Sequence, residues 1–205
     1  MPDEQDNCKQ DPSPPNDLQD QISETRHVVT INGKELQYTA TTGTLILKEE
    51  AEGDENKAKG ETPRASVFFV AYSKDGVDDV GKRPVTFSFN GGPGSSSVWL
   101  HLGLLGPRRV LMDKEGWALA PPYRLVGNEH SLLDETDLVF IDPVSTGFSR
   151  VVPGEKSDQF HNFERDIESV GDFIRLDTTR YKRWSSPKFL IGESYGTTRA
   201  AGLSG

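Results

Sequence analysis

The first part of the chain alternates apolar stretches with polar turns, as β-strands do. β-Branched and aromatic side chains are concentrated in residues 27–31, 34–40, 44–48 and 65–73. Asn32 and Gly33 separate the first two stretches and form the dipeptide typical of a tight hairpin turn. Residues 49–64 are charged and polar with two glycines and a proline, which predicts a surface loop.

A different pattern follows residue 84. Residues 84–89, 137–142 and 188–191 form short apolar runs that predict strands, and the four apolar residues between two acids in the second run are typical of a buried parallel strand. A helix is expected over residues 96–105. The pattern of strand, helix and strand predicts a parallel sheet covered on both faces, with the first hairpins as an antiparallel edge.

The clearest helix signal is one stripe of apolar residues spaced three and four apart. These residues are Phe160, Phe163, Ile167, Val170 and Ile174. We expect Ser157 or Asp158 to cap the start of this helix.

Composition separates a tail from a folded body. The 205 residues carry 23 basic and 32 acidic side chains, for a net charge of −9, and residues 1–24 hold seven of the acids, one base and four prolines. Such a segment cannot bury enough apolar surface to offset its ordering entropy, so we expect a disordered acidic tail followed by one domain over residues 25–205.

Charge and cysteine content exclude several functions. The near-balanced body shows no basic stripe for nucleic acid, and no apolar run is long enough for a membrane helix. A single cysteine, Cys8, excludes an internal disulfide and a cysteine-based metal site. No cofactor or metal is expected, and the sequence predicts no oligomeric state. The tail lacks the basic and apolar regions of a signal peptide, which favours a cytoplasmic location.

The strongest chemical signal is a G-x-S-x-G pattern, residues 192–196, between a predicted strand and a predicted helix. In this setting the serine lies on a sharp turn, with its hydroxyl above the sheet edge and the helix N-terminus beside it. Ser194 is therefore a candidate nucleophile, and the N–H of Tyr195 a candidate oxyanion donor. The alternative is a glycine-rich turn without chemistry.

A second glycine-rich loop, Asn-Gly-Gly-Pro-Gly-Ser-Ser-Ser at residues 90–97, also follows a predicted strand and precedes a predicted helix. It matches neither pattern of phosphate-binding glycine loops. Acyl transfer in this kind of architecture takes a second oxyanion donor from such a loop. Together the two loops favour acyl-transfer chemistry.

Three blocks, residues 90–97, 138–149 and 189–196, together resemble the serine carboxypeptidase family (peptidase family S10), which has the α/β-hydrolase fold. The likeness extends over about residues 33–205. It implies an α/β fold with a mostly parallel sheet and an antiparallel N-terminal edge. It also implies cleavage of C-terminal peptide bonds, with peptide C-termini as substrates.

The resemblance also implies roles for single residues. Ser194 would be the nucleophile, and the backbone N–H groups of Gly92 and Tyr195 would form the oxyanion hole. Asn90 and Glu193 would bind the free C-terminal carboxylate of the substrate. Because two carboxylates repel each other, this last pair requires a proton on Glu193 or one shared with the substrate.

The chain departs from the family pattern at two positions. Ser95 stands where the family usually has a disulfide-bonded cysteine, which fits a reducing compartment, although most of the family is secreted, lysosomal or vacuolar. Leu104 stands where members often have a glutamate that shares a proton with the elbow glutamate. We therefore expect a thinner carboxylate-binding network and no certain preference for acidic pH.

The partners of a catalytic serine are missing from the sequence. In α/β-hydrolases the acid and the histidine follow the serine, but the eleven residues after Ser194 include neither Asp nor His. We expect surface or structural roles for the four histidines, which are His27, His101, His130 and His161. Asp142 is expected to be a cap and Asp166 a solvated helix position.

Three hypotheses follow. The first is that the chain is the N-terminal part of a serine carboxypeptidase, truncated so that its sheet is incomplete on the C-terminal side. The second is an inactive fragment or pseudo-enzyme that binds peptide C-termini. The third is an esterase or acyltransferase on the same scaffold, since elbow and oxyanion hole do not define the acceptor.

Overall fold

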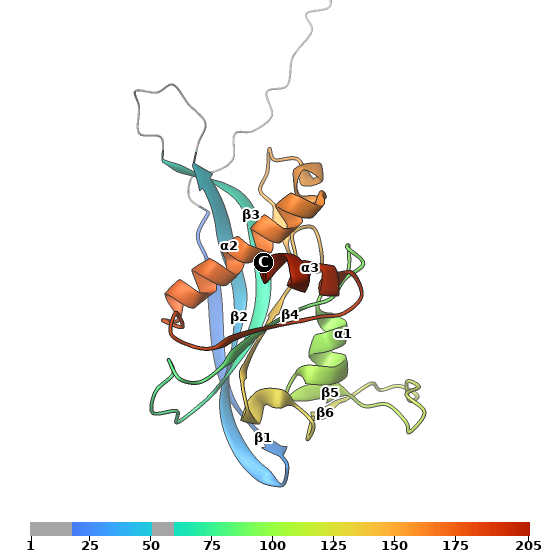
Figure 1. Cartoon of the computed structure of the whole chain (residues 1–205). Coiled ribbons are helices and arrows are strands. Elements are labelled where there is room, and N and C mark those ends of the chain that lie inside the picture. The colour runs from blue at the N-terminus through green and yellow to red at the C-terminus, as the bar shows by residue number, and fades with distance from the viewer. Residues whose placement is uncertain (1–17, 51–59) are drawn as a thin grey trace, which may run out of the picture.

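The computed structural model describes residues 18–50 and 60–205. In these residues seven strands form one sheet, and helices lie on both of its faces (Figure 1). The sheet order is β1-β2-β3-β7-β4-β9, and β8 pairs with β3. The bounds are β1 Gln21–Ile31, β2 Lys34–Glu50, β3 Glu61–Lys74, β4 Val85–Phe89, β7 Asp137–Ile141, β8 Arg150–Val151 and β9 Lys188–Gly192.

The sheet combines the two strand directions that the sequence predicts. β1, β2 and β3 pair antiparallel, and β3 pairs antiparallel with β7. β7, β4 and β9 run parallel to one another. The antiparallel N-terminal edge and the parallel strands that precede the two glycine loops are thus confirmed.

Two boundaries of the N-terminal strands were predicted wrongly. Residues 34–40 and 44–48 belong to one strand, β2, because pairing with β1 and β3 on both sides carries it through the polar residues between them. The strand β1 begins at Gln21, so the predicted end of the tail at residue 24 falls inside a strand. The predicted loop at residues 49–64 was also drawn too long, because β2 continues to Glu50 and β3 begins at Glu61. Residues 1–17, with Cys8, and residues 51–59 of that loop lie outside the described residues.

Alternation along the strands divides the core between the two faces of the sheet. On β7, Val139 and Ile141 face a cluster that includes α2 (Phe163–Arg180), with Ala200 and Leu203 of α3 (Tyr195–Leu203) packed against it. Leu138 and Phe140 face the opposite cluster, which contains the helix α1 (Val98–Leu100). All five residues of β7 are buried, as expected for a parallel strand inside a covered sheet.

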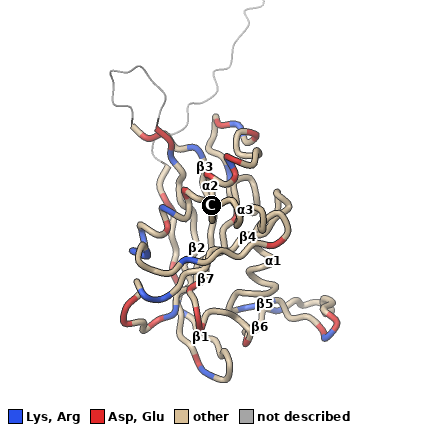
Figure 2. The backbone as a smooth tube through the Cα atoms, viewed as in Figure 1, with Lys and Arg blue, Asp and Glu red and all other residues tan. Residues whose placement is uncertain are grey.

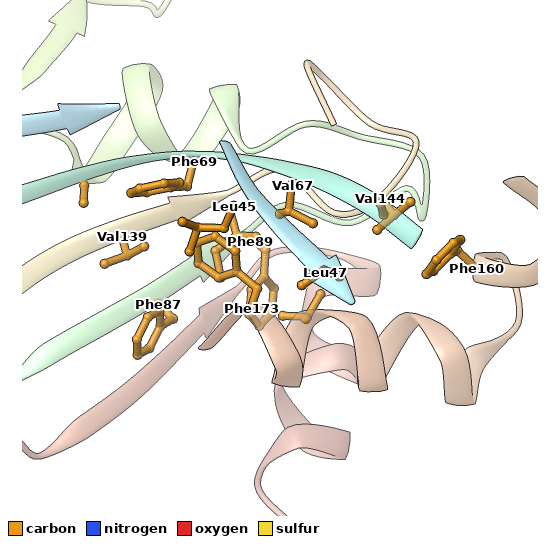
Figure 3. Packing of buried hydrophobic residues seen from close by; sticks show 14 of the residues in the cluster. Leu45, Leu47, Val67, Phe69, Phe87, Phe89, Val139, Val144, Phe160 and Phe173 are labelled. Atoms are coloured by element: carbon orange, nitrogen blue, oxygen red, sulfur yellow. The ribbon is translucent and has the colours of Figure 1, made fainter. Parts of the chain in front are cut away.

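The helix α2 supplies the largest apolar face that covers the sheet. Phe173 is fully buried, and its ring lies 5.4 Å from that of Phe69. Figure 3 shows Phe173 pointing from α2 toward Leu45 and Phe89 of the sheet. The helix begins later than predicted, since Asn162 caps it by accepting a 2.9 Å hydrogen bond from the N–H of Arg165.

The predicted caps of this helix, Ser157 and Asp158, belong to a separate turn of 3-10 helix, η3 (Ser157–Phe160). Phe160 nevertheless remains in the core, where Figure 3 shows it beside Val144. The apolar stripe therefore identified the buried face correctly but not the first residue of the helix.

The helix expected over residues 96–105 is mostly replaced by a wider turn. Only α1 is α-helical, and the π-helical turn η1 (His101–Leu105) follows it, closed by the N–H of Gly106 donating to His101 O at 3.0 Å. Two polar side chains satisfy carbonyl groups at its end. Asn128 donates to Leu104 O at 2.7 Å, and Ser131 donates to Leu105 O at 2.7 Å. These tertiary contacts decide where the helix ends.

The remaining elements lie beside α1. β5 (Arg108–Val110) and β6 (Leu125–Gly127) form a two-stranded sheet, and η2 (Leu132–Asp134) is a 3-10 turn. Figure 2 shows Lys and Arg interspersed with Asp and Glu along much of the described backbone, whereas the tube through α1 is free of charged residues. Among the described helices, none is long and apolar enough to cross a membrane.

Candidate active site

Ser194 occupies a strained turn between β9 and α3. Its φ and ψ angles are 57° and −126°, an uncommon conformation for a residue with a side chain, and the residue is exposed. The N–H of Thr197 donates to Ser194 O at 3.0 Å, and the N–H of Gly196 donates to Glu193 O at 2.9 Å. The turn therefore projects the serine side chain at the N-terminus of a helix.

The two glycines of the pattern allow this turn to pack. A Cβ atom on Gly192 would lie 2.0 Å from Gly196 O, and one on Gly196 would lie 2.6 Å from Phe89 O. Real Cβ atoms do not approach backbone oxygens so closely. Glycine is thus required at both positions, for the crossing of strand by helix and for contact with the neighbouring strand β4.

The glycine loop after β4 lies directly against the elbow. A Cβ atom on Gly91 would lie 2.4 Å from the backbone N of Tyr195 and 2.8 Å from that of Gly196. The next residue, Gly92, has a φ of 108°, which favours glycine, and it is exposed beside Ser194. The structure therefore brings Gly92, Ser194 and Tyr195 together, as the sequence predicted from two loops about a hundred residues apart.

Asn90 and Glu193 are also neighbours. Asn90 Nδ2 donates to Glu193 Oε2 at 3.1 Å, while Asn90 Oδ1 accepts from the N–H of Leu100 at 3.0 Å. Asn90 is 0 % exposed, whereas Glu193 is exposed. The buried Asn90 side chain thus connects the elbow to α1, and the carboxylate of Glu193 is the accessible group of the pair.

These residues line one open pocket of about 580 Å³ between the glycine loop, α1 and the elbow. Its lining residues are Asn90, Gly92, Ser95, Trp99, Leu100, Gly103, Leu104, Glu193 and Ser194. The sequence predicted four of these lining residues as site residues, which are Asn90, Gly92, Glu193 and Ser194, but it did not indicate that Trp99 lines the pocket.

A buried ion pair holds the site together, and sequence reasoning missed it. Arg199 of α3 is 0 % exposed and donates to Asn90 O at 2.8 Å. It also donates to both carboxylate oxygens of Asp166 on α2, at 2.9 and 3.0 Å. The prediction that Asp166 is a solvated position was therefore wrong, because only tertiary packing brings its partner to it. An arginine on the apolar face of the helix after the elbow was the available signal.

A second set of contacts fastens the far end of the glycine loop to β7. Ser97 Oγ donates to Ile141 O, and the N–H of Ser97 donates to Asp142 Oδ1 at 2.8 Å. The other oxygen of Asp142 accepts from the N–H of Phe148 at 3.2 Å. Asp142 has the structural role that was expected, but among the described residues it caps no helix.

No histidine of the described residues hydrogen-bonds to Ser194. His101 lies on η1 but contacts Tyr72, with 2.6 Å between its Nε2 and the phenolic oxygen, and its ring stacks on Phe140. Burial lowers the pKa of His101 to about 4. His27, His130 and His161 are exposed. The surface or structural positions expected for the four histidines are confirmed, and the described residues supply no base to the serine.

The mixed sheet with a serine elbow directly after the parallel strand β9 defines the chain as an α/β-hydrolase. A family model described as serine carboxypeptidase matches residues 57–203, so the chain belongs to the serine carboxypeptidase family.

Individual relatives agree with this assignment. "Serine carboxypeptidase-like 33" of Arabidopsis thaliana is 31% identical over 140 residues, which are 62% of this chain and 25% of that protein. "Pheromone-processing carboxypeptidase KEX1" of Saccharomyces cerevisiae is 32% identical over 137 residues, which are 62% of this chain and 17% of that protein.

The crystal structure of the yeast prohormone-processing carboxypeptidase Kex1 matches with a TM-score of 0.55 and 26% identity, over 82% of this chain and 33% of that one. The chain thus spans a third or less of each of these three relatives.

Proposed function

We propose that this chain supplies the nucleophile and the oxyanion hole of a serine-type carboxypeptidase. The observation that carries the proposal is the close packing of Gly91 against the elbow, where a Cβ on Gly91 would lie 2.4 Å from the backbone N of Tyr195. Two convergent backbone donors next to a serine hydroxyl are what acyl transfer requires. Family membership and peptide-processing relatives support the same chemistry.

In the proposed reaction, Ser194 Oγ attacks the carbonyl carbon of the last peptide bond. The developing oxyanion accepts hydrogen bonds from the N–H groups of Gly92 and Tyr195, near the positive end of the α3 dipole. Expulsion of the C-terminal amine leaves an ester on Ser194, which water then hydrolyses. A base must take the serine proton and give it to the leaving amine. Among the described residues no histidine is placed to do so.

The end of the substrate would lie against Glu193. The hydrogen bond from Asn90 holds this glutamate at the pocket beside Ser194. A carboxylate ligand can hydrogen-bond to Glu193 only if the two groups share a proton. Asn90, which is fully buried with both polar atoms paired, would act through the position of Glu193.

A second candidate function is binding of peptide C-termini without hydrolysis. One observation favours it: His101, which lies on η1 shortly after the glycine loop, is hydrogen-bonded to Tyr72 and not to Ser194. An esterase or acyltransferase role stays open on the same geometry, since nothing in the pocket specifies the acceptor of the acyl group. The cytoplasmic location stays a prediction.

A fluorophosphonate probe tests the nucleophile. We expect slow labelling of this chain at Ser194, located by peptide mass spectrometry, and none in Ser194→Ala. In a longer polypeptide that also contains the acid and the histidine, labelling should be faster by orders of magnitude. Fast stoichiometric labelling of the 205-residue chain would instead show that the base lies within it. Labelling at another serine would refute the assignment of Ser194.

A further inference from the structure

The strand β1 forms one end of the sheet (Figure 1). Among residues 18–50 and 60–205, no strand pairs with its outer edge. The residue before the strand leads away from that edge, because Asp20 accepts a hydrogen bond from the N–H of Ile46 at 2.8 Å and forms an ion pair with Arg180 of α2. Residues 23–28 are all exposed, so the neighbouring elements leave both faces of this stretch accessible.

The edge lacks the features by which proteins usually block strand pairing. Protected edges are short, carry lysine or proline, or are bent by a bulge. β1 is 11 residues long, contains no Lys or Pro, and pairs with β2 in an unbroken register from Gln21 to Ile31. A regular edge of this length offers a row of backbone N–H and C=O groups to a further strand.

The turn at residues 32–33 decides which backbone groups point outward. Ile31 and Lys34 flank this two-residue turn, whose central residues both have a positive φ, and such flanking residues form a hydrogen-bonded pair. The odd-numbered residues of β1 therefore direct their N–H and C=O groups toward β2. The even-numbered residues direct theirs toward the outer edge, so a second copy of β1 must pair there with even-numbered residues opposite one another.

The charges on β1 select one register for such a pair. Glu24 and Arg26 are exposed, and both lie opposite threonines of β2. When two β1 strands pair antiparallel about Thr25, each Glu24 lies opposite the partner's Arg26, and the two-fold symmetry forms this pair twice. Moving the centre by one residue in either direction places Arg26 opposite Arg26 or Glu24 opposite Glu24, and like charges directly opposite destabilise a sheet.

The same register also matches the uncharged side chains. Val28, which is 48% exposed, would lie opposite the partner's Ile22 on the face that carries the two charges. On the other face Thr25 would lie opposite its own copy, and threonine pairs are favourable across strands. One register thus combines backbone pairing, two ion pairs and apolar contact.

We propose that two copies of this chain associate through β1, as an antiparallel β1–β1 pair centred on Thr25 that joins their sheets into one. The partner is a second copy because the order of charges along the strand is complementary to itself. β1 and β9 stand at opposite ends of the strand order, so the proposal does not depend on the chemistry of Ser194.

Sedimentation velocity of the 205-residue chain tests the association. Between about 1 and about 200 µM we expect the average mass to rise from that of one chain toward that of two, by mass action. Glu24→Lys places a cation opposite the partner's Arg26 at both symmetry-related positions, so the dimer should weaken at least about tenfold. Adding Arg26→Glu reverses both charges and should restore the dimer to within about threefold of the wild type.

A control variant accounts for the change in net charge. Glu115→Lys makes the same charge change on the exposed turn between β5 and β6 and should leave the association unchanged. A chain that stays monomeric over the whole range would overturn the proposal, even if it binds an unrelated extended peptide at β1. A charge-reversed double variant that stays as weak as Glu24→Lys, with native circular dichroism, would do the same.

A disulfide tests the register directly. Thr25 would lie opposite its own copy in a non-hydrogen-bonded pair, where the Cα atoms are about 4.5 Å apart, a distance that a disulfide can span. In a Cys8→Ser background, which removes the one native cysteine, Thr25→Cys should give a covalent dimer on oxidation. Ser23→Cys is the matched control, because the two copies of residue 23 would be roughly 14 Å apart. Equal cross-linking of the two variants, or none of Thr25→Cys, would overturn the proposal.

Discussion

Asp177 should make the folded chain less stable as pH rises toward neutrality. This carboxyl group on α2 is 2% exposed, and its Oδ1 has no hydrogen-bond partner among the described residues. Burial raises the pKa of Asp177 from 3.8 to about 7, although Arg183 and Arg180 act in the opposite direction. Tyr181, one turn further along, also has a buried hydroxyl without a described partner.

The direction of the effect follows from proton linkage. Between about pH 4 and pH 7 the folded chain retains a proton on Asp177 that the unfolded chain has released, so unfolding releases a proton. The contribution of Asp177 to the free energy of unfolding therefore falls as pH rises through this range. Each pKa unit corresponds to about 1.4 kcal/mol, so a shift of this size is worth at most roughly 4 kcal/mol. This pKa already includes the opposing effect of the two arginines, and water penetration reduces the expected contribution to about 2–3 kcal/mol.

The measurement is urea unfolding of the wild type and of Asp177→Asn at intervals from pH 4 to pH 8. Other titrating groups contribute equally to both chains, so the difference between the two free energies isolates Asp177. We expect this difference to decline steadily with rising pH and to level off above pH 7. Tyr181→Phe, which removes the neighbouring hydroxyl and no carboxyl group, should retain the wild-type slope. A difference that stays flat or increases with pH would refute the reasoning.

Three other substitutions test the site and its supports. Gly196→Ala should lower the free energy of unfolding in urea by about 2 kcal/mol or more and abolish phosphonate labelling of Ser194, because the added Cβ would lie 2.6 Å from Phe89 O. In the control variant Gly94→Ala the added Cβ meets nothing within 4 Å, so stability and labelling should both be unchanged. Asp166→Asn should cost about 3–5 kcal/mol in the same assay by leaving the buried guanidinium of α3 without its counter-charge, and a loss under about 1 kcal/mol would contradict this. Burial lowers the pKa of His101 to about 4, so the contribution of His101 to stability should fall as pH drops from about 6.5 to 4. Thermal unfolding of the wild type and of His101→Phe should show this as a difference in stability between the two chains that declines over that range.

Local patterns predicted the strands next to the site and the residues on the two glycine loops. The apolar runs at 84–89, 137–142 and 188–191 became β4, β7 and β9. β4 and β7 are buried along their whole length, as apolar parallel strands inside a covered sheet are, whereas β9 is only partly buried. The glycines at 192 and 196 predicted a sharp turn, and the structure shows backbone approaches that exclude any side chain there. These signals are local in sequence, so the sequence alone carried them.

Other features depend on partners far away along the chain. The unbroken β2 exists because β1 and β3 pair with its polar middle, and the π turn after α1 exists because Asn128 and Ser131 satisfy its carbonyls. The pattern of hydrophobic residues within a segment cannot predict such contacts, because a distant partner leaves no trace in the hydrophobic periodicity of the segment whose structure it changes.

The sequence by itself determined the family, the candidate nucleophile and the two loops that meet beside it. Only the tertiary structure decided that Asn90 is buried with its side chain hydrogen-bonded within the protein, and that Glu193 is the accessible group. It also decided that Arg199 forms a buried ion pair with Asp166 and hydrogen-bonds to the backbone of Asn90. The physical reason is that exposure and pairing are properties of the packed chain. An asparagine or an arginine has the same letter in a sequence whether its hydrogen bonds go to water, to substrate or to the protein itself.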